Sequence, residues 1–321
     1  MILCGFVYIC NQKMEKNDKM KPVIDPIPRE VIESELTPDK LLRKTNNAGN
    51  EIYVITAQDS PHIMRELGRL REVSFRDAGG GTGCEVDIDE LDEVPGGYNQ
   101  LFVWDPKARE ILGGYRFIVS HETHPRHLST EHYFRFSDRF REEFLPYTIE
   151  LGRSFVQPHY QGTRVNPKGL YALDNLWDGL GALVLNNPDM RYFLGKVTMY
   201  GDYNVDARNK LLYFLNKYFP DRDHLVDPIY PIRLNIDTGA MERLFVGGDY
   251  AEDYKILVRE VRRMQENIPP LINSYMSISP SMRVFGTVVN PDFGDVEETG
   301  ILITISDIYP KKSERHFRME E

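Results

Sequence analysis

The chain has 321 residues, 41% of them hydrophobic and 11% aromatic, which is enough to bury one or two substantial cores. Its 39 Lys and Arg against 49 Asp and Glu give a net charge of −10, which argues against a dedicated nucleic-acid binder because such proteins need a basic face. The three cysteines, Cys4, Cys10 and Cys84, are too few and too unevenly spaced for a disulfide framework and favour a reducing compartment.

The first ten residues are apolar, but a membrane span needs about 20 residues. They also lack the basic start and small-residue cleavage site of a signal peptide. We therefore expect a cytoplasmic protein, with at most a peripheral contact to a membrane surface. Residues 11–50 are polar and charged and contain several prolines, so we expect residues 1–50 to form an extended N-terminal arm.

A regular pattern begins at residue 51. Residues 52–55 predict a strand, and Ser60 followed by Pro61 predicts a helix start. Apolar residues then recur at helical spacing as far as Val73. Residues 100–104 and 111–119 are two β-type runs separated by a turn, and they predict a hairpin.

The second half continues the alternation. Residues 148–156 predict a strand, and Asn166 and Pro167 cap a long amphipathic helix. A strand at 193–200 and helices at 206–219 and 252–267 follow, with strand-like runs at 284–289 and 300–305. We expect an α/β layered core over 51–235 and a C-terminal elaboration, 236–321, packed on the same sheet.

The segment 148–156 carries a carboxylate, Glu150, and a guanidinium, Arg153, within an apolar strand. Burying charge there is costly unless the charges pair with each other or with a ligand. The pair is therefore either a structural clasp or part of a polar active site. Residues three apart on a regular strand point to opposite faces, so a shared site requires a bulge. We predict a bulge at 151–153, with Gly152 supplying the unusual backbone.

Two other charged clusters invite a metal hypothesis. The run 85–93 holds six carboxylates, but counted from Asp87 it lacks the glycine and the final Glu of a calcium loop. A solvated loop is the simpler interpretation, although the alternating apolar residues suggest that some acids point inward. Four histidines between 121 and 132 lack a metal-ligand pattern, and the interleaved arginines favour a basic, aromatic surface that receives an acidic protein. We expect no metal site.

Separated motifs resemble the GNAT acyltransferase superfamily, in its branch that takes acyl groups from acyl carrier protein. That branch includes acyl-homoserine-lactone synthases and the hemolysin-like lipoamino-acid N-acyltransferases, and the chain most resembles the glycine-lipid type. The motifs that carry this resemblance are Leu70-Arg71 with Phe75, the acidic run containing Asp87 and Asp89, Gly113-Gly114-Tyr115-Arg116, and Glu150-Leu151-Gly152-Arg153-Ser154 with Pro158 and Tyr160.

The resemblance implies a three-layer α/β (α+β) sandwich with a mixed, mostly antiparallel sheet, as in GNAT proteins and autoinducer synthases. It implies transfer of a 3-hydroxy fatty acyl group from acyl carrier protein to the α-amine of glycine. Acyl-phosphopantetheine would be a co-substrate, with no permanently bound cofactor. Coenzyme-A-dependent members carry Gln/Arg-x-x-Gly-x-Gly/Ala before the helix. Here the aligned residues are His159, Gly162 and Arg164, which favours the carrier protein and keeps coenzyme A as the alternative.

The resemblance also suggests residue roles. Glu150, desolvated in an apolar strand, would act as the base that deprotonates the acceptor amine. Arg153 would bind the acceptor carboxylate or hold Glu150 in place. Further contacts to substrate or pantetheine are expected from Arg71, Arg116, Asp87, Asp89, Gly152, Ser154, Gly162 and Arg164.

Alternatives remain at this stage. Ornithine is the other lipoamino-acid acceptor, and its second ammonium would need a dedicated acid. Acyl-homoserine-lactone synthesis is a further option. From another class, the chain would be a non-catalytic module that binds acyl carrier protein, and a Glu150 locked away from any cavity would support that.

Overall fold

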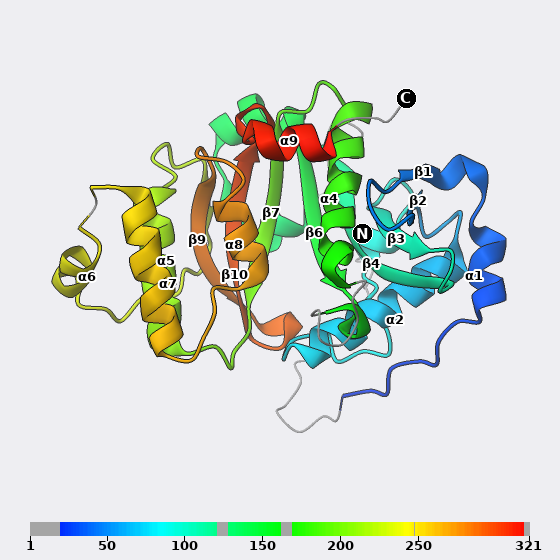
Figure 1. The fold of residues 1–321 in the computed structure, drawn as a ribbon, viewed down its shortest axis with the longest axis horizontal. Helices are drawn as coiled ribbons and strands as arrows, with labels where there is room; N and C mark the ends of the chain where they lie inside the picture. The colour runs from blue at the N-terminus through cyan, green and yellow to red at the C-terminus, as the bar shows by residue number, and fades with distance from the viewer. Residues whose placement is uncertain (1–19, 121–127, 162–168, 247, 318–321) are drawn as a thin grey trace, which may run out of the picture.

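The computed structural model describes residues 20–120, 128–161, 169–246 and 248–317. Its centre is an eight-stranded sheet in which β6 and β7 are the one parallel pair and the other neighbours are antiparallel (Figure 1). In spatial order the strands are β1 (Leu41–Lys44), β2 (Glu51–Ile55), β3 (Asn99–Asp105), β4 (Glu110–Val119), β6 (Thr148–Val156), β7 (Tyr192–Met199), β10 (Val296–Thr304) and β9 (Arg283–Asn290). The expected hairpin is β3–β4.

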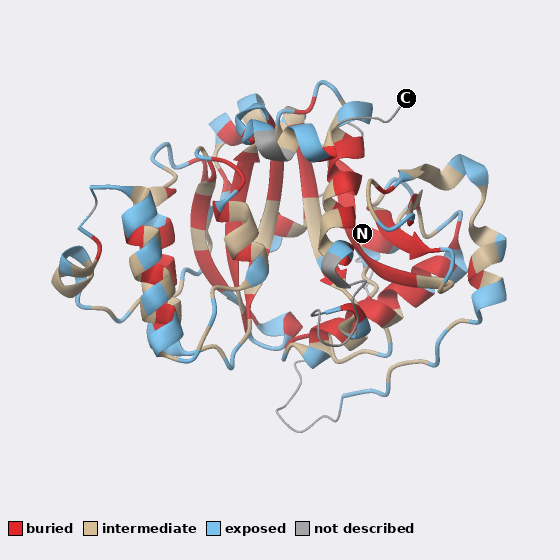
Figure 2. Ribbon diagram, in the orientation of Figure 1, coloured by how far each residue is buried: buried red, intermediate tan, exposed pale blue. Residues whose placement is uncertain are grey.

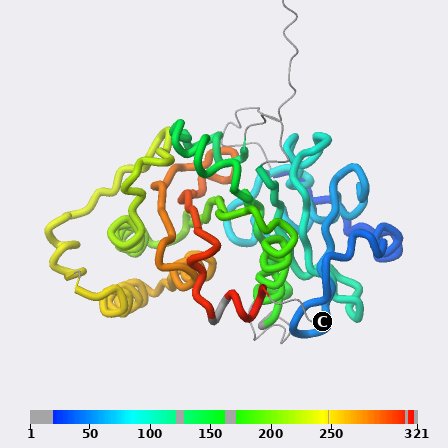
Figure 3. The backbone as a smooth tube through the Cα atoms, turned by 90° about the horizontal axis from the view of Figure 1, so that it is seen from above, coloured from blue at the N-terminus to red at the C-terminus, as the bar shows by residue number. Residues whose placement is uncertain are grey.

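Helices cover both faces of this sheet. One face carries α4 (Gly169–Asn186), α5 (Val205–Tyr218), α7 (Tyr250–Arg263) and α8 (Pro270–Met276). The other carries α2 (Pro61–Asp77) and a small sheet of β5 (Phe134–Phe136) and β8 (Val226–Pro228). Seen from above, α4 and α8 lie on one side of the strands and the segment before β6 on the other (Figure 3). The predicted α/β three-layer arrangement with a mixed, mostly antiparallel sheet is confirmed.

Shorter helices complete the chain. They are α1 (Arg29–Glu35), α3 (Glu90–Glu93), α6 (Thr238–Leu244) and α9 (Pro310–His316). In addition, 3-10 turns include η1 (Pro38–Lys40), η3 (Ser129–His132), η5 (Leu145–Tyr147), η6 (Pro158–Tyr160), η7 (Pro291–Phe293) and η8 (Ile305–Asp307), and η4 (Phe140–Phe144) is a π-helix.

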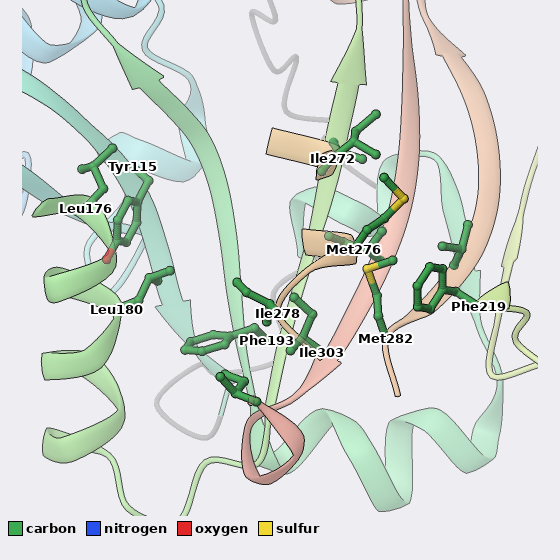
Figure 4. Packing of buried hydrophobic residues seen from close by; sticks show 14 of the residues in the cluster. Tyr115, Leu176, Leu180, Phe193, Phe219, Ile272, Met276, Ile278, Met282 and Ile303 are labelled. Carbon is green, nitrogen blue, oxygen red and sulfur yellow. The ribbon is translucent and has the colours of Figure 1, made fainter. Parts of the chain in front are cut away.

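The sheet is buried over most of its central length (Figure 2). On the α4 side, Tyr115 of β4 packs on Leu176 and Leu180, while Phe193 of β7 and Ile303 of β10 pack beneath α8 (Figure 4). On the other side, α2 forms one apolar cluster with β2, β3 and β4, and β5, β8 and η4 form another over β7, β10 and β9. Burial on both faces is why these strands are rich in apolar residues.

Part of the expected N-terminal arm is folded. Within residues 20–50, α1 packs against α2 through the buried Ile32, and β1 adds an edge strand to β2. The expectation of an extended arm is therefore wrong for 29–44. The apolar residues among the charges of this segment find partners on α2 and β2, which is non-local information that the composition does not contain.

The C-terminal segment contributes to the main sheet. β10 lies between β7 and β9, and each of the eight residues Glu297 to Thr304 pairs with a residue of β7. Residues 236–321, expected to pack on the core, thus supply two strands of the sheet. In the part of the chain that the structure describes, no helix has the length and apolar character needed to cross a bilayer.

Candidate active site

The predicted bulge exists, but one residue further along β6. Gly152 pairs with Arg116 of β4, and Phe155 pairs with Gly114, so Arg153 and Ser154 together face the single residue Tyr115. Two residues opposite one is the definition of a β-bulge. Arg153 itself has φ +52°, whereas Gly152 lies in the regular ladder. The expectation that Gly152 supplies the unusual backbone is wrong. Arg153 takes the left-handed conformation instead, and its side-chain contacts hold its backbone there.

This bulge can be tested by a pair of substitutions. Arg153→Ala and Arg153→Gly both remove the guanidinium, but a left-handed backbone costs alanine about 1 kcal/mol more than glycine. We expect the free energy of unfolding of Arg153→Gly to exceed that of Arg153→Ala by about 1 kcal/mol in urea denaturation.

The matched control is Gly152→Ala. A Cβ at Gly152 would meet Arg116 Nε at 3.4 Å, an ordinary contact, so little destabilisation is expected. A costly Gly152→Ala together with equal stabilities for the two Arg153 variants would place the bulge where the sequence predicted it.

The bulge brings Arg153 to the same sheet face as Glu150 and Arg116. Across the ladder, Glu150 pairs with Ile118 and Gly152 with Arg116, so the side chains of Glu150 and Arg116 share one face. Arg153 and Arg116 both reach Asp89, at 3.6 and 2.8 Å. Within the described residues, however, Glu150 and Arg153 form no ion pair with each other.

Glu150 is enclosed by its own set of donors. Its carboxylate accepts hydrogen bonds from the hydroxyl of Tyr98, the backbone N–H of Ser129 (3.1 Å), and the N–H and hydroxyl of Thr130 (2.7 and 2.5 Å). The residue is 1% exposed. Glu150 therefore fastens η3 to the sheet, and its side chain does not line the cavity that opens beside β6; its role as a base stays a prediction.

The acidic run folds inward onto three arginines. Asp87 and Asp92 are each 1% exposed. Asp92 lies 3.2 Å from Arg71 and 3.2 Å from Arg116, and Asp87 lies 2.9 Å from Arg153. The interpretation of a solvated loop is therefore wrong for these two acids. Buried charges survive when they are paired and hydrogen-bonded, which explains why carboxylates and arginines occur together here.

The electrostatics of this cluster follow from the pairing. The guanidinium groups of Arg116 and Arg153 hold the pKa of the Asp89 carboxyl far below its usual value, against the opposing effect of burial. Burial raises the pKa of Asp87, although Arg153 and Arg71 oppose it. Arg71, expected to contact substrate, is 1% exposed and donates to Asp92, Gln100 and the carbonyl of Asp87. It therefore holds the acidic loop in place.

A cavity opens where β6 and β7 part. The two strands pair in parallel as far as Leu151 and Gly195. Beyond these residues, the backbone N–H and C=O groups of one strand no longer pair with those of the other. A cavity of about 460 Å³ lies at this divergence. It is lined by residues of both strands, together with α2, α8 and β10.

The cavity has an apolar part and a polar part. The apolar part lies on the sheet face that α8 covers. It is lined by Phe193, Ile301 and Ile303 of the sheet, together with Leu173 and Leu271. The polar part lies on the opposite face of the sheet. It is lined by Lys196, Thr198 and Glu298 of β7 and β10, together with Ser129, Arg153 and Tyr200. The cavity thus passes between the strands, with charged groups at one end only.

The predicted site residues divide into three groups. Arg153, Gly152 and Ser154 line the cavity. Glu150, Arg71, Arg116, Asp87 and Asp89 do not line it, although the structure brings all but Glu150 into one ion-pair cluster behind Arg153. Gly162 and Arg164 lie outside the described residues.

In the expected basic surface around 121–144, two of the three arginines that the structure describes are paired with carboxylates. Arg139 pairs with Glu143 at 3.0 Å, and Arg141 pairs with Glu131 at 2.5 Å. The aromatic residues Phe134, Phe136 and Phe140 are buried in the core. These nearby carboxylates offset part of the positive charge that, from the sequence, was expected to bind an acidic protein. In the described ranges, no group of three or more His, Cys, Asp or Glu side chains is arranged to hold a metal ion.

Two charged residues of the cavity were missed from the sequence, Lys196 and Glu298. Lys196 is the one charge within the strand β7, and Glu298 follows Glu297 at the start of the apolar strand β10; a charge within an apolar strand is the signal that identified Glu150. Their ion pair, 3.0 Å between Nζ and Oε2, joins strands β7 and β10. The same criterion applied to 192–199 and 296–304 would have found them.

Comparison with known proteins identifies the class. Residues 70–168 match the family model described as an acetyltransferase (GNAT) domain, which spans α2, β3, β4, β6 and the bulge. The chain therefore contains a match to a GNAT acyltransferase domain, which includes the bulged strand β6.

Two curated proteins cover nearly the whole chain. A glycine N(alpha)-acyltransferase of Phocaeicola vulgatus is 55% identical over 92% of this chain and 93% of its own length. One of Bacteroides thetaiotaomicron is 53% identical over 93% of this chain and 90% of its own length. The chain belongs to the family of these glycine N(alpha)-acyltransferases, and it is an acyltransferase.

Solved structures are more distant. The N-acyl amino acid synthase FeeM from uncultured soil microbes gives a TM-score of 0.40 at 8% identity, covering 80% of this chain and 92% of that one. The coenzyme-A-dependent acyl-homoserine lactone synthase BjaI gives 0.37 at 12% identity, covering 83% and 87%. The family assignment rests on the two curated relatives.

Proposed function

We propose that the protein transfers a fatty acyl group, 3-hydroxylated as the resemblance implies, from an acyl carrier protein thioester to the α-amine of glycine. The observation that carries this proposal is the cavity at the divergence of β6 and β7, with one apolar and one charged end. An acyl chain suits the apolar end, and an amino acid suits the charged end. The backbone N–H groups freed beyond Leu151 and Gly195 are placed to stabilise the thioester oxyanion.

The charges of the cavity support glycine over ornithine. Among the described lining residues, the charged ones are Arg153, Lys196 and Glu298. Asp87, Asp89 and Asp92 balance Arg153 together with Arg71 and Arg116 behind it, and Glu298 balances Lys196, so this end carries no net charge. A neutral zwitterion such as glycine matches it, whereas the second ammonium of ornithine finds no free acid. Of the acids of 85–93, Asp87, Asp89 and Asp92 are paired with arginines, and none of the six lines the cavity.

The donor is proposed from the sequence. The positions that would complete a coenzyme A phosphate loop are occupied by His159 and Arg164, neither of which matches the coenzyme A pattern. A carrier protein presents one phosphodiester and needs fewer phosphate contacts. Peripheral contact with a membrane would bring the acylated product to its destination, and it remains part of this proposal.

One experiment tests donor and acceptor together. The purified chain is incubated with acyl carrier protein or coenzyme A thioesters of a 3-hydroxy fatty acid, each with glycine, ornithine or S-adenosylmethionine, and products are identified by mass spectrometry. We expect N-acylglycine from the carrier protein thioester. N-acylornithine or an acyl-homoserine lactone as the main product would overturn the acceptor, and preference for coenzyme A would overturn the donor. The absence of any acyl product would leave the non-catalytic carrier-binding module.

A further inference from the structure

Lys196 and Glu298 form a charged pair inside the cavity, at the vertex of the strand divergence. Lys196 is the first residue of β7 after Gly195, where pairing with β6 ends. Glu298 lies on the neighbouring strand, opposite Thr198. Their side chains are 11% and 6% exposed, yet both line the cavity. A charge pair removed from bulk water and facing a cavity interacts strongly with a charged ligand.

Lys196 is the charged partner of Glu298 in the cavity. Its Oε2 atom is buried and accepts no hydrogen bond within the described residues, although Lys196 Nζ lies 3.0 Å away. Lys196 in turn lies 3.4 Å from the carbonyl of Ser129 and over the ring of Tyr133. The other titratable groups facing Glu298 are Tyr200 and Tyr133. Burial raises the pKa of both tyrosines; the charge of Glu298 adds to this for Tyr200, and for Tyr133 it adds less than Asp292 does.

Building on the proposed transfer to glycine, we infer that Lys196 and Glu298 form the acceptor site, in which Glu298 is the base and Lys196 binds the acceptor carboxylate. A zwitterion aligns antiparallel to the pair, with its ammonium on Glu298 and its carboxylate on Lys196. This assignment supplies the carboxylate that Glu150, enclosed by Tyr98 and Thr130, does not provide.

The reaction balances with these groups alone. The ammonium gives one proton to the Glu298 carboxylate, and the free amine attacks the thioester carbonyl carbon. A C–N bond forms and the C–S bond breaks. A second amine proton goes to the departing thiolate, the third stays on the amide nitrogen, and Glu298 returns its proton to solvent.

The test compares two adjacent glutamates in the full-length chain. Glu298→Gln is expected to lower kcat/KM for glycine about 100-fold or more, the usual effect of losing a general base, and to abolish the acidic limb of the pH–rate profile. The control is Glu297→Gln. Glu297 lies next in the strand, pairs with Arg208 at 2.7 Å and does not line the cavity, so near wild-type kinetics are expected.

Lys196 has a separate readout. Lys196→Met is expected to raise KM for glycine about tenfold while leaving KM for glycinamide, which lacks the carboxylate, unchanged. Melting curves establish that each variant folds. If Glu298→Gln does not fold, two other variants replace it. Glu298→Asp should retain partial activity and the acidic limb of the pH–rate profile. The charge-neutral double variant Lys196→Met/Glu298→Gln should lose both.

The outcomes separate the two proposals. An active wild type in which Glu298→Gln, or the double variant in its place, matches Glu297→Gln within threefold would overturn the acceptor site and leave the transfer to glycine standing. Equal effects of Lys196→Met on glycine and glycinamide would overturn the carboxylate contact. A folded wild type that makes no acylglycine from any thioester would overturn both proposals.

Discussion

Replacing Arg116 with methionine is expected to lower the free energy of unfolding by about 3–5 kcal/mol, because removing one partner of a buried ion pair leaves the other charge unpaired. Arg116 is 1% exposed, lies 2.8 Å from Asp89 and 3.2 Å from Asp92, and its guanidinium sits over the ring of Tyr98. Methionine fills part of the space but leaves Arg71 as the remaining cationic partner of Asp92 among the described residues. Urea or guanidinium denaturation followed by circular dichroism measures the change.

The matched control is an exposed ion pair. Lys255 lies 2.7 Å from Glu252 on the outer face of α7, with side chains 70% and 66% exposed. Lys255→Met should shift the unfolding transition little, because water and salt screen an exposed ion pair. Equal effects of the two substitutions would show that the arginine cluster is not what holds the acidic loop.

Glu150→Gln is the second change with a large expected effect, and it separates an anchoring role from a role as base. The amide offers one acceptor oxygen where the carboxylate offered two, so its NH₂ group meets the donors of Ser129, Thr130 or Tyr98. We expect a loss of roughly 2–3 kcal/mol in the free energy of unfolding, because a hydrogen-bonded buried charge is lost.

Activity distinguishes the two roles of Glu150. Ser129 lines the cavity, so loosening η3 should reduce kcat, but the pH–rate profile should keep its shape. Thr130→Val, which removes only the hydroxyl bond to Glu150, should show a smaller change of the same kind. Loss of the acidic limb in Glu150→Gln, with unaltered stability, would restore Glu150 as the base.

Local patterns predicted much of the fold. The start of α2 at Pro61 follows from the serine–proline signal, and the β3–β4 hairpin from two apolar runs around a turn. The need for a bulge near Arg153 followed from the alternation of a strand. These features are decided by neighbouring residues, so one sequence contains the information.

The errors have a common physical cause. The bulge lies at Arg153 because Asp87, 66 positions earlier, and the ring of Phe293 fix its side chain. Lys196 and Glu298 form an ion pair only when β7 and β10 align. Each depends on a contact between distant segments, which a periodicity does not report. Glu150 was singled out correctly as a buried charge, but its partners on Tyr98 and η3 were not visible.

The position of β10 has a consequence for how the protein is made. Glu298 and its β7 partner Thr198 are a hundred residues apart in the chain, and β10 enters the sheet between two strands that precede it. Before β10 arrives during synthesis, β7 presents a bare edge, and Phe193 lacks the cover of Ile303. Such late, long-range closure is slow, so the nascent chain passes through an aggregation-prone stage that a chaperone would shield.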